Sequence, residues 1–167
     1  SQQYGDQETG LFFMRVRFSC FDGDELETLR TDFARISASF DMSFTLRGSK
    51  ERQRVLLMVS KFGHCLNDLL FRHRIGALPI DIVGVVSNHR DYEDLVDDND
   101  IPFHYIPVTP ETKVDAEKQL LHIVETEAID LVVLARYMQV LSEDLCRALE
   151  GRAINIHHSF LPSFKGG

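Results

Sequence analysis

An amide and an imidazole stand two residues apart near the end of the chain, at Asn155 and His157. Ile154 and Ile156 alternate with them, which is the period of a β-strand with one apolar face. Side chains two apart on a strand point the same way, so the amide and the imidazole share one face. An amide donates hydrogen bonds and an imidazole can carry a proton, so the pair predicts a site of polar chemistry. The alternative is that His157 is a satisfied core histidine and Asn155 a turn residue.

The residues after this strand favour the interpretation as a site. Pro162 and the final pair Gly166-Gly167 take the chain out of regular structure. A polar pair at the end of a buried strand, followed by a loop, is typical of ligand sites in open α/β sheets. We therefore expect the strand around Asn155 to be buried and to end at the site.

The run NIHHSFLPSFKG that begins at Asn155 resembles the active-site signature of the folate-dependent formyltransferase family. Within that family, the doubled histidine His157-His158 resembles the signature of the branch that hydrolyses 10-formyltetrahydrofolate to formate and tetrahydrofolate. The resemblance, which continues upstream to Arg54, implies that Asn155 donates to the oxyanion of a tetrahedral intermediate. It implies that His157 also stabilises this oxyanion and passes a proton to the departing folate nitrogen. The family's third catalytic residue, an aspartate, is expected beyond Gly167, and no cofactor is implied because the folate is the substrate.

A second part of the resemblance covers residues 134–141, with the sequence LARYMQVL. It is similar to the family's pterin-binding segment, in which backbone groups and apolar side chains hold the ring. The substrate-binding residues implied are Arg136, Tyr137, Met138, Gln139, Val140 and Leu141. Gln139 stands where the family often has arginine. The alternative is that Tyr137 and Met138 are only core residues.

The loop Lys61-Phe62-Gly63-His64, after the first long apolar run, is the candidate region on the side of the nucleophile. Dinucleotide-binding folds carry G-x-G-x-x-G there, and this loop has one glycine, so we expect no nicotinamide or flavin. Family members that formylate glycinamide ribonucleotide have a glycine- and serine-rich loop that cradles the acceptor's phosphate. Phe62, His64 and Cys65 replace small residues here. Lys61 and His64 can still attract an anion, but the close approach to the backbone is lost, which favours water as the acceptor. The alternatives are a glycinamide ribonucleotide formyltransferase and a sensing module that binds folate without catalysis.

Apolar runs alternate with amphipathic stretches through residues 54–167, and this alternation predicts the fold. The expected strands are 55–60, 80–86, 103–108, 129–134 and the one around Asn155, and the expected helices are near 66–73, 92–96, 113–127 and 143–149. Strand and helix in turn predict right-handed crossovers and a doubly wound, mainly parallel, Rossmann-like α/β sheet. The resemblance implies that residues 54–167 are a formyltransferase-type catalytic domain that is truncated at its C-terminus.

Residues 1–50 show a strand pattern at 11–18, a helix from Glu25 whose apolar face packs on that strand, and another strand pattern at 42–46. Some fifty residues are too few for an independent core. The pattern, with the run TGLFFMRV at 9–16, resembles the second half of an ACT domain, a ferredoxin-like α+β regulatory module. The resemblance implies an amino-acid effector and pairing across subunits, hence a homo-oligomer. The alternative is an appendage that only packs on the catalytic domain.

Composition limits the classes of partner. A net charge of −8 and a pI near 5.3 disfavour binding to nucleic acid or to an anionic membrane. The sequence has no membrane-spanning run and no signal peptide, and its three scattered cysteines are typical of reduced thiols in a cytoplasmic protein. No metal is expected, because His157 and His158 face opposite sides of a strand and no third ligand has suitable spacing. Both ends of the chain look cut, so we expect a fragment.

Overall fold

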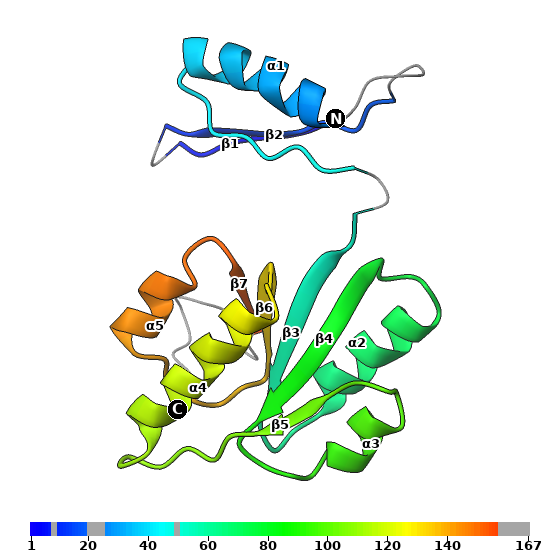
Figure 1. Cartoon of the computed structure of the whole chain (residues 1–167), viewed down its shortest axis with the longest axis vertical. Coiled ribbons are helices and arrows are strands. Elements are labelled where there is room, and N and C mark those ends of the chain that lie inside the picture. The colour runs from blue at the N-terminus through cyan, green and yellow to red at the C-terminus, as the bar shows by residue number, and fades with distance from the viewer. Residues whose placement is uncertain (8–9, 20–25, 49–50, 157–167) are drawn as a thin grey trace. The chain divides into compact units, whose positions relative to one another are not determined.

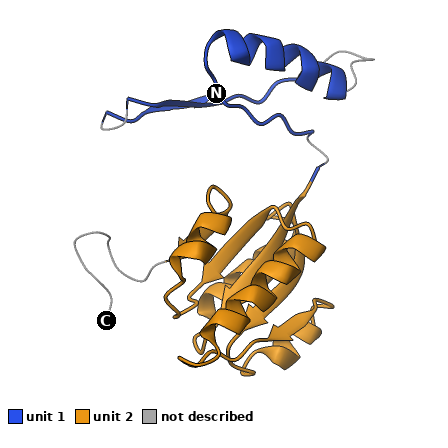
Figure 2. Cartoon of the chain, turned by 60° about the vertical axis from the view of Figure 1, so that its left-hand side comes forward, with its two compact units in different colours: residues 1–51 blue, residues 52–167 orange. Residues whose placement is uncertain are grey.

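The structure is a computed structural model that describes residues 1–7, 10–19, 26–48 and 51–156. The chain divides into two compact units, residues 1–51 and 52–167 (Figure 2). The candidate residue His157 lies outside the described residues, as does Cys20. Within the described part, no helix is both long enough and apolar enough to cross a membrane.

The described part of the second unit is built on a five-stranded parallel sheet with the strand order β5-β4-β3-β6-β7 (Figure 1). The strands are β3 Gln53–Val59, β4 Ile80–Ser87, β5 Phe103–Tyr105, β6 Leu131–Ala135 and β7 Ala153–Ile156. The helices are α2 His64–Arg74, α3 Glu93–Asp97, α4 Lys113–Thr126 and α5 Glu143–Ala148. The strand order reverses between β3 and β6, which makes this the switch point of the sheet. The predicted parallel α/β sheet is confirmed.

Strand β3 is the centre of the sheet because its apolar run packs on both faces. Residues 55–59 are fully buried, as a strand covered on both sides requires. Val55, Leu57 and Val59 pack with side chains of α2 and α3. Leu56 and Met58 face the opposite way and pack with α4 and α5. Each such buried side chain contributes about 1.5–3 kcal/mol, so the switch point lies in the most firmly packed part of the unit.

Two strands at the edges of the sheet differ from the prediction. β5 is Phe103–Tyr105 and does not reach residue 108; Pro107, which has no N–H to donate, follows soon after. β7 was expected to be buried, yet Ile154 is 52% exposed and Asn155 is exposed too. That expectation is wrong for the described residues, because β7 pairs only with β6 and has no second neighbour among them.

The first unit contains a hairpin and a helix. β1 Gln2–Gly5 pairs antiparallel with β2 Phe12–Arg15, and α1 spans Leu26–Ser39. The predicted helix is confirmed, whereas the predicted strand at 11–18 is shorter. β1 was not predicted, because its sequence QQYG carries no apolar alternation. The expectation that this unit is an ACT-like module stays a prediction.

The predicted strand at 42–46 does not form. Residues 43–48 have no assigned strand structure and contact α1 through side chains. The Phe44 ring meets the Phe33 ring edge-on, with centroids 4.9 Å apart, and Arg30 Nε donates to Leu46 O at 3.1 Å. The apolar alternation is therefore satisfied by packing on a helix, without the ladder that defines a strand.

Candidate active site

The three candidate segments follow or end neighbouring strands. β6 lies between β3 and β7 in the sheet, and parallel strands end at the same edge. The loop 61–63 follows β3, the segment 136–141 follows β6, and Asn155 lies in β7. The fold therefore brings together at one edge three segments separated by up to about ninety residues in sequence, at the place where open α/β sheets bind ligands.

The Ser60 side chain ties the first two segments together. Ser60 Oγ donates to Asn88 Oδ1 at 2.8 Å and accepts from the backbone N–H of Met138 at 2.9 Å. Its own backbone N–H donates to Arg136 O at 3.3 Å. Ser60 is only 2% exposed, so one buried hydroxyl fixes the start of the predicted pterin-binding segment against the ends of β3 and β4. Sequence analysis missed Ser60 and Asn88 because both are commonplace at strand ends.

Replacing Ser60 with alanine should lower the free energy of unfolding by about 1–3 kcal/mol, because it leaves the Met138 N–H and the Asn88 carbonyl without this buried partner. Urea denaturation measures the effect as a lower midpoint at unchanged slope. Thr126→Ala is the matched control, since it removes a hydroxyl from an exposed position of α4 and should change stability by less than about 0.5 kcal/mol. Equal midpoints for Ser60→Ala and the parent protein would contradict the assigned network.

Arg136 links the two loops in a second way and has an unusual backbone. Its guanidinium carbon lies 5.4 Å from the centroid of the Phe62 ring, within cation–π range. Its φ is 61°, in the left-handed region that non-glycine residues rarely adopt. Its Nε is buried and has no hydrogen-bond partner among the described residues. Strain and an unsatisfied donor in one residue are typical of functional sites.

Tyr92 holds the loop after β3. Its hydroxyl accepts from the Gly63 N–H at 2.7 Å and donates to Lys61 O at 3.2 Å. A Cβ added at Gly63 would lie only 2.3–2.7 Å from ring atoms of Tyr92. The glycine of this loop is therefore required by an aromatic ring packed against its backbone. Sequence analysis placed Tyr92 in a helix and gave it no part in the site.

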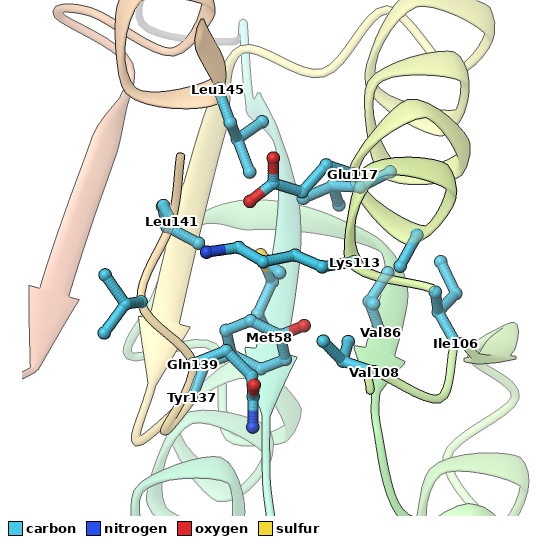
Figure 3. A pocket seen from close by; sticks show the side chains of 13 residues that line it. Met58, Val86, Ile106, Val108, Lys113, Glu117, Tyr137, Gln139, Leu141 and Leu145 are labelled. Carbon is cyan, nitrogen blue, oxygen red and sulfur yellow. The ribbon is translucent and has the colours of Figure 1, made fainter. Parts of the chain in front are cut away.

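A hollow lies beside the segment after β6, on the α4 and α5 face of the sheet. Met58 and Val86 form apolar parts of its lining, and Tyr137, Gln139, Val140 and Leu141 contribute from the segment itself. From α4, Lys113 and Glu117 extend toward that segment (Figure 3).

The predicted segment itself divides into packed and exposed side chains. Tyr137 and Leu141 pack against the core on the α4 and α5 face, so Tyr137 is in part a core residue. Met138 and Val140 are 47% and 82% exposed, so the core alternative does not describe Met138. Among the described residues, the side chains of Met138 and Val140 are therefore open to solvent.

The Tyr137 phenol should ionise only at strongly alkaline pH, and its ionisation can be followed by absorbance. Burial, with the Glu117 carboxylate adding to it, raises the pKa of Tyr137 from 10.0 to about 12. Between those two values the unfolded chain loses this proton while the folded chain keeps it, so stability should fall as pH rises from 10 to 12. The difference titration between the parent protein and Tyr137→Phe should show one group near pH 12. A difference midpoint near 10 would show that Tyr137 is accessible to water.

Asn155 shares its face of the sheet with the floor of the hollow. It stands opposite Leu134 on β6, Leu134 stands opposite Met58 on β3, and Met58 stands opposite Val86 on β4. Residues directly opposite one another in a sheet point to the same side. At about 4.8 Å per strand, Asn155 lies about 10 Å from Met58. It does not line the hollow itself, but its amide and the hollow are on one side of the same edge.

Among the described residues, no group of three or more histidine, cysteine, aspartate or glutamate side chains could hold a metal ion. Cys65 and Cys146 are free.

An open parallel sheet whose candidate segments lie at the switch point defines a doubly wound α/β protein, a class in which ligands bind at that point. Residues 53–167 match the formyl transferase family, and the chain belongs to that family.

Its relatives include formyltetrahydrofolate deformylases. The chain is 52% identical over 166 residues to formyltetrahydrofolate deformylase of Corynebacterium sp. (strain P-1), covering 99% of this chain and 58% of that protein. A crystal structure of a formyltetrahydrofolate deformylase from Pseudomonas putida KT2440 is similar with a TM-score of 0.88 and 47% identity, covering 99% of this chain and 59% of that one. The chain thus spans about three-fifths of the length of these relatives.

A phosphoribosylglycinamide formyltransferase from Coxiella burnetii is more distant. Its structure is similar with a TM-score of 0.62 and 31% identity, covering 70% of this chain and 56% of that one. The more extensive similarity is therefore to the deformylases.

Proposed function

We propose that this chain belongs to an enzyme that hydrolyses 10-formyltetrahydrofolate to formate and tetrahydrofolate. The observation that carries the proposal is the identity of 52% to a formyltetrahydrofolate deformylase across 99% of the chain. The arrangement of loops at the ends of β3 and β6, with Asn155 on the neighbouring strand, supports it. Supply of formate to one-carbon and purine metabolism would be the role of such an activity.

The proposed chemistry is addition and elimination at the formyl carbon. The oxygen of water bonds to that carbon with loss of one proton, and the carbonyl oxygen of the formyl group becomes an oxyanion. The oxyanion then re-forms a carbonyl as the carbon–nitrogen bond to the folate breaks, which leaves formate and the protonated folate nitrogen. The Asn155 amide would donate to the oxyanion, and His157 would stabilise it and give a proton to the leaving nitrogen. The third group, an aspartate beyond Gly167, would orient the histidine and position the water.

The folate would lie along the segment after β6. Pterin edges are rich in donors and acceptors, which suits the backbone groups of residues 136–141. The exposed side chains of Met138 and Val140 would cover the ring, and Ser60 would hold the segment in place. Arg136, supported on Phe62, would face the space between the two loops.

The test is release of formate by a protein that spans the full length of the relatives. With 10-formyltetrahydrofolate alone, we expect tetrahydrofolate, followed by absorbance, and formate, measured separately, to form in equal amounts. Adding glycinamide ribonucleotide should neither raise the rate nor yield a formylated nucleotide. Formyl transfer to the nucleotide with negligible formate in its absence would replace the hydrolase with the transferase that the Coxiella burnetii relative exemplifies.

We further propose that residues 1–51 mediate assembly of this enzyme into a homo-oligomer, as expected for an ACT-like module with an amino-acid effector. Large apolar side chains of β2 support this, since Phe12, Phe13 and Met14 are 64%, 53% and 57% exposed. Exposed apolar side chains on neighbouring positions are typical of an interface. Light scattering measures the molar mass of the full-length protein and of a variant that lacks residues 1–51. A lower oligomeric state in the shortened variant is the expected result.

A further inference from the structure

The turn after β3 is closed by contacts from a different part of the chain. Tyr92, just before α3, accepts the Gly63 N–H at 2.7 Å and donates to Lys61 O at 3.2 Å. Its ring fills the place of a Gly63 Cβ, with three ring atoms within 2.7 Å of that position. The same ring packs against the core between the sheet and the helices α2 and α3, so it is anchored from behind.

We propose that Tyr92 determines which acceptor this enzyme uses, by closing the loop 61–63 against phosphate and leaving water as the nucleophile. The proposal rests on the hydrolytic function proposed above and names the residue that excludes the alternative acceptor. Tyr92 is a positioning residue, because it acts through the loop and not by contact with a reacting atom.

The physical reason is competition for one backbone donor and one space. α/β folds bind phosphate at the turn between a strand and the next helix, where N–H groups point outward and glycine allows close approach. Here the N–H of the loop's glycine is taken by the Tyr92 hydroxyl. The space that glycine leaves open is taken by the Tyr92 ring. A phosphate would have to displace the Tyr92 side chain to reach this N–H or to enter this space.

Lys61 in this loop can attract an anion by its charge, so the exclusion of phosphate depends on the occupied N–H and on the filled space. Phe62 is 55% exposed, and its ring supports the Arg136 guanidinium. Displacing Tyr92 would therefore also disturb the contact that joins the loop to the segment after β6. Water requires neither the N–H nor the space, so the closed loop does not hinder hydrolysis.

The experiment measures inhibition of formate release by glycinamide ribonucleotide and by inorganic phosphate in full-length protein. The parent protein should be insensitive to both at millimolar concentration. Tyr92→Ala frees the Gly63 N–H and the space together, so its inhibition constant for the nucleotide should fall at least about tenfold, as one added charge-assisted hydrogen bond would give. A melting curve for each variant checks that it is folded.

Two matched variants distinguish a specific effect at the loop 61–63 from a general loss of packing around residue 92. Tyr92→Phe frees the N–H of residue 63 but keeps the ring in the space beside it. The double variant Gly63→Ala with Tyr92→Ala also frees this N–H but puts a methyl group into the vacated space, so in both variants the approach of a phosphate remains obstructed. Both should remain within about twofold of the parent in sensitivity to the nucleotide. Where Tyr92→Ala does not fold, Tyr92→Leu, which keeps apolar contact with the core but lacks the length to reach Gly63, takes its place.

The outcomes are distinct. A folded Tyr92→Ala (or Tyr92→Leu) variant as insensitive as the parent, or equal gains of sensitivity in all variants, would overturn the role of Tyr92. Formate release absent from the parent protein would instead overturn the proposed function. In that case calorimetric titration of the same variants with the nucleotide would still decide whether Tyr92 excludes it.

Discussion

Replacing Asn155 with alanine in the full-length protein should lower turnover of 10-formyltetrahydrofolate by about a hundred- to a thousand-fold, the cost of removing one oxyanion donor. The fold should be little affected. Among the described residues, Asn155 is exposed and contributes nothing to the packed core, so the melting temperature should stay within a few degrees. The effect should lie in kcat, because a donor to a developing charge acts mainly in the transition state.

Ile154→Ala is the control for this variant. Ile154 is the adjacent residue of β7, points to the opposite face and is 52% exposed. Its replacement disturbs the strand to a similar degree without touching the amide, so turnover should stay within about threefold. If Asn155→Ala retained near-normal kcat, or if Ile154→Ala lost as much, the amide would not be the oxyanion donor.

Gly63→Ala should lower the free energy of unfolding by about 1–3 kcal/mol, the usual cost of forcing extra volume into a packed place. The backbone is not the reason, since φ at Gly63 is −98°, which any residue adopts. The reason is that the new methyl group would meet the Tyr92 ring at 2.3–2.7 Å. The ring must then move, and the hydrogen bonds from its hydroxyl to the loop go with it. Urea denaturation measures the loss.

A double-mutant cycle tests the cause. With Tyr92→Ala already present, Gly63→Ala should cost almost nothing, because the clash is gone, and the two changes should be strongly non-additive. Gly76→Ala provides the contrast, since its Cβ would meet nothing within 4 Å and its φ of 72° is the only obstacle. Its cost of about 1 kcal/mol should be unaffected by Tyr92→Ala. Additive costs at Gly63 and Tyr92 would refute the contact.

The sequence predicts local structure well where one face or both faces of an element must be buried. The apolar run at 55–60 predicts a central strand, and β3 is that strand. The helical spacing at 113–127 predicts α4, which buries Ala116, Leu120 and Val124. Prediction fails where burial depends on a neighbour. Residues 42–46 have the alternation of a strand but no ladder partner in the part of the chain that the structure describes. β7 has the alternation of a buried strand but pairs only with β6 among the described strands.

Some parts of the candidate site can be predicted from the sequence, and others are revealed only by the fold. Its chemical groups are visible in the sequence, because the segment from Arg136 and the pair at Asn155 and His157 belong to patterns with a family resemblance. Their supports are not visible, because Ser60, Asn88 and Tyr92 belong to no pattern and act through contacts made across the sheet.

By itself, then, the sequence determines which short segments are strands, which are helices and which carry reactive groups, since these follow from local periodicity and composition. Only the tertiary structure decides that β6 lies beside β3, so that Ser60 meets Met138 from 78 residues away. It alone decides that Tyr92 closes the turn at Gly63. Strand order and close packing depend on the shapes of surfaces brought together from distant parts of the chain, and no window of neighbouring residues contains that information.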